Sequence, residues 1–141
     1  MRQNRYLFVG PQGCGKTALI LALQGKYEQN SRLLPTQGMT SYGKYIDLPG
    51  NYFDDPAGYP ILSVCSQQAE VVVLVVSADQ TALVIPEGFK NLFIRPVIGV
   101  ITKIDVANAD SQKAASILKG AGVKTPIHMV SVRTGEGIDC F

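Results

Sequence analysis

The segment 10–17 reads Gly-Pro-Gln-Gly-Cys-Gly-Lys-Thr and matches the phosphate-binding pattern G-x-x-x-x-G-K-[S/T] at every position. An apolar run at 6–9 precedes it, and a helix-like run at 18–23 follows it. The pattern requires this context of strand, tight loop and helix, because the free N–H groups and the dipole of a helix N-terminus attract anions. The sequence therefore predicts a phosphate-binding loop at the centre of an α/β fold.

The residue types in this loop suit a polyphosphate. Glycine permits positive φ angles and a close backbone approach, so that successive N–H groups can point into one concavity. The lysine would bring positive charge to the β- and γ-phosphates, and the threonine hydroxyl would ligate Mg²⁺. We therefore expect eight residues to bind nucleotide, with the lysine acting also in catalysis: Gly10, Pro11, Gln12, Gly13, Cys14, Gly15, Lys16 and Thr17.

The length of 141 residues suits one domain, 1–141, with a proper core. The formal net charge is only +2 and the basic residues are scattered, which argues against a nucleic-acid partner. No apolar run is long enough for a signal sequence or a membrane span, so we expect a cytoplasmic protein without membrane contact. The three cysteines show no C-x-x-C spacing, which suits a reducing compartment.

Cys14 lies beside Lys16 and a helix N-terminus, two features that favour the thiolate. A redox role is one interpretation of this cysteine. A small residue that fills the loop is the interpretation we favour.

Short β-type runs alternate with helical runs along the chain, which predicts a three-layer α/β/α sandwich with a mainly parallel sheet. Segment 26–39 reads as a mobile loop, 51–59 reads as a loop, and 82–90 fits no regular element. A final helix would begin near residue 135 and reach about its first turn. We expect strands at 5–9, 42–48, 70–77, 96–102 and 127–130, and helices at 16–23, 60–68 and 110–120.

Two further features fit a magnesium nucleotide. Asp47-Leu48-Pro49-Gly50 follows an expected strand, so Asp47 could hold Mg²⁺ through a water while the Gly50 N–H senses the γ-phosphate. Thr36, in the expected mobile loop, could close on the same ion and take part in catalysis. We therefore expect Thr17, Thr36 and Asp47 to form the metal site.

The tetrapeptide Thr102-Lys103-Ile104-Asp105 follows another expected strand and suits a guanine base. The Asp105 carboxylate can accept hydrogen bonds from N1–H and N2–H₂ of guanine, whereas adenine would leave it facing an acceptor, a mismatch of about 1–3 kcal/mol. The Lys103 stem can lie over the base. We expect Thr102, Lys103 and Asp105 to bind the base, with backbone contacts from Ser131 and Val132 after the last strand.

Taken in order, these motifs resemble those of Ras-like P-loop GTPases and, more closely, those of the EutP/PduV family of ethanolamine and propanediol utilisation proteins. The resemblance implies a compact GTP-binding protein of a bacterial catabolic operon, linked to a shell-bound microcompartment. Members of this family have been described as acetate kinases, so the resemblance also implies phosphoryl transfer to a small carboxylate as an alternative activity. The segments that carry it span nearly the whole chain: Gly10-Pro11, 14–17, 35–37, Asp47, Pro49-Gly50, Ala78-Asp79, Pro86, Gly88-Phe89, 95–99, Thr102-Lys103, Asp105 and 137–139.

The chain departs from the Ras-like pattern in three places. Only ten residues separate Thr36 from Asp47, so the antiparallel edge hairpin must be truncated or absent. Asn51 stands where those enzymes have a water-orienting glutamine, and it is too short to replace that residue readily, so hydrolysis should be slow. A truncated final helix would leave one sheet face partly uncovered, which favours a homo-oligomer or a protein partner.

The leading hypothesis is Mg²⁺-dependent binding of GTP and GDP with slow hydrolysis. The second is a kinase that phosphorylates a small carboxylate such as acetate from ATP or GTP, although the sequence offers no obvious acetate pocket. Arg95 and Arg133 are its candidates for a catalytic arginine, by proximity alone. The third is a non-catalytic nucleotide-binding adaptor for a microcompartment shell protein.

Overall fold

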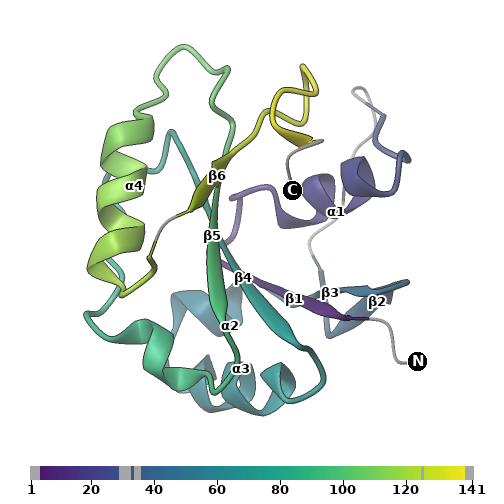
Figure 1. Cartoon of the computed structure of the whole chain (residues 1–141), viewed down its shortest axis with the longest axis vertical. Coiled ribbons are helices and arrows are strands. Elements are labelled where there is room, and N and C mark those ends of the chain that lie inside the picture. Colours follow the sequence, from purple (N-terminus) through teal and green to yellow (C-terminus); the bar gives the residue numbers. More distant parts are fainter. Residues whose placement is uncertain (1–3, 29–32, 34–35, 125, 139–141) are drawn as a thin grey trace.

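The computed structural model describes residues 4–28, 33, 36–124 and 126–138. Its centre is a sheet of six strands in the order β2-β3-β1-β4-β5-β6 (Figure 1). All neighbouring strands pair in parallel except the antiparallel edge pair β2 and β3. The strands are β1 (Tyr6–Val9), β2 (Thr40–Tyr42), β3 (Tyr45–Asp47), β4 (Val71–Ser77), β5 (Val97–Thr102) and β6 (Ile127–Met129).

Helices cover both faces of the sheet, which confirms the three-layer prediction (Figure 1). Alternate residues of β1 explain the layers: Phe8 packs in a core with α1, whereas Leu7 and Val9 pack in a second core with the other helices. The helices are α1 (Lys16–Leu23), α2 (Asn51–Asp54), α3 (Tyr59–Ser66) and α4 (Ser111–Gly120), with 3₁₀ turns η1 (Pro56–Gly58) and η2 (Phe89–Leu92). No helix in the described ranges is long and apolar enough to cross a membrane.

Helices α1 and α4 agree closely with the sequence-based prediction. Gly25, with φ 71°, follows the C-cap of α1, and Gly122, with φ 101°, follows that of α4. Both glycines take the left-handed conformation that ends helices. The Asp110 carboxylate accepts a hydrogen bond from Lys113 N and caps α4.

Two segments differ from the prediction. The single strand expected at 42–48 is wrong: Gly43 turns the chain at φ 63°, so β2 and β3 form a short hairpin. The edge hairpin is therefore truncated rather than absent. The loop expected at 51–59 contains α2 and η1, because Phe53 is buried and packs edge-on against Phe89, 5.2 Å between ring centroids.

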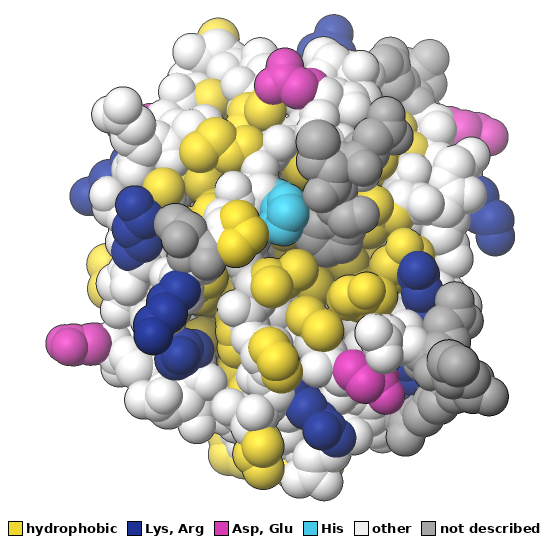
Figure 2. Space-filling view, in the orientation of Figure 1, with side chains coloured by type: hydrophobic (Ala, Val, Ile, Leu, Met, Phe, Trp, Pro, Cys, Tyr) yellow, Lys and Arg dark blue, Asp and Glu magenta, His cyan; other side chains and the backbone are white. Residues whose placement is uncertain are grey.

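The face of the sheet next to α1 is covered by that helix alone among the described helices. Figure 2 shows hydrophobic side chains gathered around the single histidine on this side. A cavity of about 160 Å³ lies here, lined by Tyr6, Lys44, Tyr45, Ile98 and His128. The predicted final helix extends into residues 139–141, which lie outside the described residues.

We expect Gly10→Ala to destabilise the fold, because an added Cβ would lie 2.3 Å from the Val75 carbonyl oxygen in β4. Overpacking of this kind costs about 1–3 kcal/mol, and here the clash is with backbone, which cannot rotate away. Thermal unfolding should show a clearly lower Tm. Gly120→Ala is the control, because nothing lies within 4 Å of an added Cβ there. Equal melting temperatures for both variants would contradict this reasoning.

Candidate functional site

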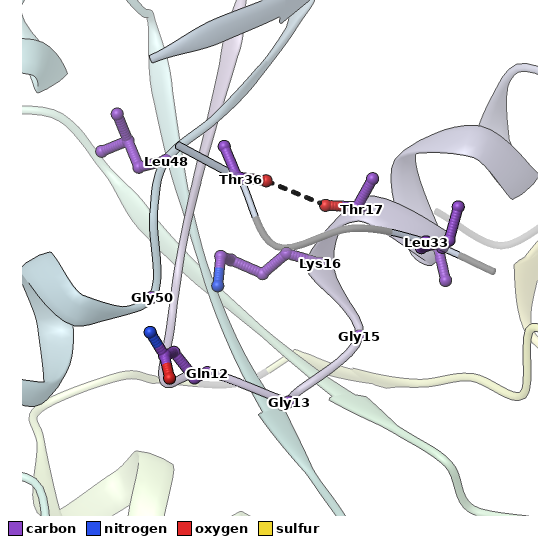
Figure 3. Close-up of a pocket in the computed structure, with 10 residues that line it drawn as sticks. Gln12, Gly13, Gly15, Lys16, Thr17, Leu33, Thr36, Leu48 and Gly50 are labelled. Atoms are coloured by element: carbon purple, nitrogen blue, oxygen red, sulfur yellow. Dashed lines mark hydrogen bonds between the residues drawn. The ribbon is translucent and has the colours of Figure 1, made fainter. Parts of the chain in front are cut away.

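The glycine-rich loop lies between the C-terminal end of β1 and the N-terminus of α1 (Figure 3). Gly13 and Gly15 have φ angles of 78° and 89°, which a side chain at either position would disfavour. Gly15 is the N-cap of α1 and offers no side chain to bond the first N–H groups of the helix. These groups have no partner inside the helix, so the loop presents free donors and a positive dipole end.

A cavity of about 340 Å³ opens at this loop. The Lys16 side chain reaches into it and is the charged group among the described lining residues (Figure 3). The cavity is therefore concave, rich in N–H donors and positively charged, as an anion site requires. Its lining residues are Gln12, Gly13, Gly15, Lys16, Thr17, Ala18, Leu33, Thr36, Leu48 and Gly50.

Lys16 is buried, and its ammonium is held by the loop itself. Nζ donates to the carbonyl oxygens of Gly10 at 3.0 Å and Pro11 at 3.4 Å, and lies 3.8 Å from Cys14 Sγ. Burial raises the pKa of the Cys14 thiol, although Lys16 opposes that shift. Burial therefore opposes the two sequence features that favour the thiolate, and the full burial of Cys14 beneath the loop fits the filler interpretation that we favour.

Thr17, Thr36 and Asp47 meet at the edge of this cavity. Both hydroxyls donate to Asp47 Oδ2, at 2.5 Å from Thr17 and 2.8 Å from Thr36. The two hydroxyl oxygens lie 3.2 Å apart (Figure 3). Asp47 is fully buried, and its Oδ1 has no hydrogen-bond partner. Two hydroxyls and a carboxylate with an orphaned oxygen are a donor set that suits Mg²⁺, a hard cation that prefers oxygen ligands.

A second cavity, of about 300 Å³, adjoins the first and shares Gly15 and Ala18 with it. Thr102 Oγ1 donates to Cys14 O at 2.5 Å, and Lys103 Nζ donates to Gly13 O at 2.7 Å, so both residues tie the end of β5 to the loop. Among the described residues other than glycine, Lys103 is the one with a positive φ angle, 59°. Four predicted base-binding residues line this cavity: Thr102, Lys103, Asp105 and Val132.

Not every predicted binding residue lines a cavity. Gly10 and Pro11 instead supply carbonyl oxygens to Lys16. Ser131 is buried, and its N–H donates to Glu136 O at 2.9 Å within its own loop, so that N–H is not available to a base. The Ser131 carbonyl oxygen also accepts within this loop, from Gly135 N at 2.8 Å, so the predicted backbone contact with a base has less support at Ser131 than at Val132, which lines the second cavity. Asn51 is exposed at the start of α2 and is not among the lining residues.

The structure adds lining residues that the sequence patterns missed. Tyr27 lines the second cavity and Leu33 lines the first, and neither belongs to a motif of the sequence. Asp79 and Arg133, which the sequence analysis named without a binding role, also line the second cavity. Tyr27 had a local signal, since it is an aromatic residue at the exit of α1. Leu33 had none, because tertiary packing alone brings it to the site.

A family model described as ethanolamine utilisation and propanediol utilisation matches residues 3–141. The chain belongs to this PduV-EutP family. A "Propanediol utilization protein PduV" of Citrobacter freundii is 33% identical over 105 residues, which cover 74% of this chain and 68% of that protein. A "Probable acetate kinase EutP" of Escherichia coli K12 is 33% identical over 126 residues, covering 88% of this chain and 77% of that protein. The same name and identity recur in Salmonella typhimurium, over 125 residues, 88% of this chain and 77% of that protein. The predicted resemblance is thereby confirmed at family level.

Proposed function

We propose that this chain binds GDP and GTP with Mg²⁺ and hydrolyses GTP slowly. The observation that carries the proposal is the contact of the two cavities at Gly15 and Ala18. The first cavity is lined by Lys16 and rich in N–H donors, and the second has the Asp105 carboxylate among its lining groups. One continuous ligand, with phosphates at one end and a guanine base at the other, would satisfy both.

In this proposal, the loop N–H groups and Lys16 hold the phosphates, while Asp105 accepts hydrogen bonds from the base. Thr17, Thr36 and Asp47 would hold Mg²⁺, with Asp47 acting through a water. When bound, the ion would neutralise phosphate charge and orient the terminal phosphate. Asn51 is exposed and short, so it is poorly suited to orient an attacking water, which supports slow turnover.

The test is a titration of the purified protein with GDP, GTP, ADP and ATP, each with Mg²⁺ and with EDTA. We expect guanine nucleotides to bind at least about tenfold more tightly than adenine nucleotides, since each lost hydrogen bond to the Asp105 carboxylate costs over 1 kcal/mol. Equal affinity for both bases, or no binding of either, would contradict the proposal.

Asp47→Asn should uncouple nucleotide binding from Mg²⁺. The variant keeps an acceptor for Thr17 and Thr36 but removes the buried negative charge that would face the ion. We expect the Mg²⁺-dependent gain in GTP affinity to fall about tenfold, measured by the same titrations. Asp55→Asn is the control, because Asp55 is exposed and only caps η1. An unchanged Mg²⁺ response in Asp47→Asn would exclude Asp47 from the metal site.

We keep a second function open, transfer of the γ-phosphoryl group from ATP or GTP to an oxygen of acetate. Its support is the name of the Escherichia coli and Salmonella typhimurium relatives, probable acetate kinase. Leu33 and Leu48 give the phosphate cavity an apolar side that could contact a methyl group. Trapping acetyl phosphate with hydroxylamine tests this second function. A hydroxamate signal no higher than that of the no-enzyme blank would exclude it.

We also propose that the protein acts in a bacterial microcompartment of ethanolamine or propanediol catabolism, where it contacts a shell protein. The support is membership of a family described by those two pathways. A non-catalytic adaptor is the limiting case, in which nucleotide binds without turnover. Affinity purification from cells induced with either substrate tests this, and failure to recover any shell component would count against it.

A further inference from the structure

Both backbone polar groups of Gln12, in the glycine-rich loop, form hydrogen bonds with side chains from outside the loop. The Gln12 backbone N–H donates to Asp54 Oδ2 at 3.3 Å, and the Gln12 carbonyl oxygen accepts from Gln80 Nε2 at 3.1 Å. The same residue packs closely against Gly50, where an added Cβ would lie 2.5 Å from Gln12 N. Thus Asp54, at the end of α2, and Gln80, in the turn after β4, hold the two peptide groups on either side of the Gln12 Cα.

Gln12 lies at the end of the first cavity that is remote from the proposed base site. Gly15 and Ala18 are the residues shared with the base-side cavity, whereas Gln12 and Gly50 line the first cavity alone. In Figure 3 Gln12 and Gly50 lie next to each other, with the Lys16 ammonium directed toward them. A nucleotide that runs from the second cavity into the first would place its terminal phosphate at this end.

We propose that Asp54 makes the site discriminate between nucleoside diphosphate and nucleoside triphosphate, in favour of the diphosphate. The inference rests on the proposed nucleotide binding. A carboxylate bonded to the loop at Gln12 places negative charge beside the γ-phosphate position and occupies a loop N–H that an anion could otherwise approach. The β-phosphate, nearer to Gly15 and Ala18 where the two cavities meet, is farther from this charge and should be affected less.

If the Asp54 carboxylate only joined α2 to the loop, its replacement would change the affinity for both nucleotides alike. Asp54→Asn separates the two roles, because its amide oxygen still accepts a hydrogen bond from Gln12 N while the charge is gone. Asp55→Asn is a matched control: it removes the same charge one residue away, where the side chain bonds Ala57 N instead of the loop. Both carboxylates are exposed, so both variants should fold.

The experiment measures Kd for GDP and for a non-hydrolysable imido analogue of GTP, with Mg²⁺, at about 0.05 M and 0.5 M salt. We expect Asp54→Asn to raise the affinity for the analogue relative to GDP by about 3- to 10-fold at low salt, as one partly screened charge should. The gain should shrink at high salt, and Asp55→Asn should change the ratio less than twofold.

Three results would overturn the proposal for Asp54 alone: an unchanged ratio in Asp54→Asn, an equal change in Asp55→Asn, or a gain that is independent of salt. Wild-type protein that binds neither GDP nor the analogue would remove the proposed function together with this inference. The Gln12 amide resonance of the free protein gives a nucleotide-independent check. It should move in Asp54→Ala, which removes the acceptor, and an unmoved resonance would overturn the contact.

Discussion

Replacing Lys16 by alanine should lower the affinity for GDP and GTP by at least about 100-fold. Lys16 is only 7% exposed and is the charged side chain among the described residues that line the phosphate cavity. Bonds to a charged group are worth about 1.5–3 kcal/mol each, so the loss of contacts to two phosphates exceeds about 3 kcal/mol. Titration with labelled GDP and GTP measures the loss.

The same variant also removes the Lys16 bonds to Gly10 O and Pro11 O, so its fold must be checked by thermal unfolding. Lys113→Ala is the control, because this lysine is exposed on α4, outside both cavities. A folded Lys16→Ala protein that binds GTP as the wild type does would show that the loop is not the phosphate site.

The features that the sequence predicted correctly are coded locally. The loop pattern, the bounds of α1 and the Asp110 cap of α4 each depend on residues close together in the chain. The meeting of Thr17, Thr36 and Asp47 was also predictable, although the three are distant in sequence. Parallel strands bring their C-terminal ends to one edge of a sheet, and Thr17 follows β1 while Asp47 ends β3. Thr36 precedes the antiparallel strand β2, whose first residue pairs with Asp47 at the same edge.

The features that were missed depend on tertiary contacts. Gly43 could have signalled the β2–β3 turn, but the apolar and aromatic run around it masked the break. Helix α2 has only four residues, and burial of Phe53 rather than propensity supports it. The Asp54 contact with Gln12 joins residues 42 positions apart, and no spacing rule in the sequence indicates such a pair.

Asp105→Asn should convert a preference for guanine into one for xanthine. The asparagine amide would place its NH₂ opposite the N2–H₂ donor of guanine, so one hydrogen bond is lost and two donors face each other. That mismatch costs about 2–3 kcal/mol, so GDP affinity should fall about 100-fold. Xanthine carries an acceptor at C2, which the same NH₂ can satisfy, so XDP should bind at least about tenfold more tightly than GDP.

Competition titrations with GDP and XDP on the wild type and the variant measure this exchange. Asp110→Asn is the control, since asparagine also caps helices and Asp110 lines neither cavity. Asp105 lines its cavity and is itself exposed, so its replacement leaves the core intact. The substitution changes only the hydrogen-bonding edge that faces the base. An equal loss of affinity for GDP and XDP would therefore indicate damage to the loop after β5. Unchanged GDP affinity would show that the base binds elsewhere.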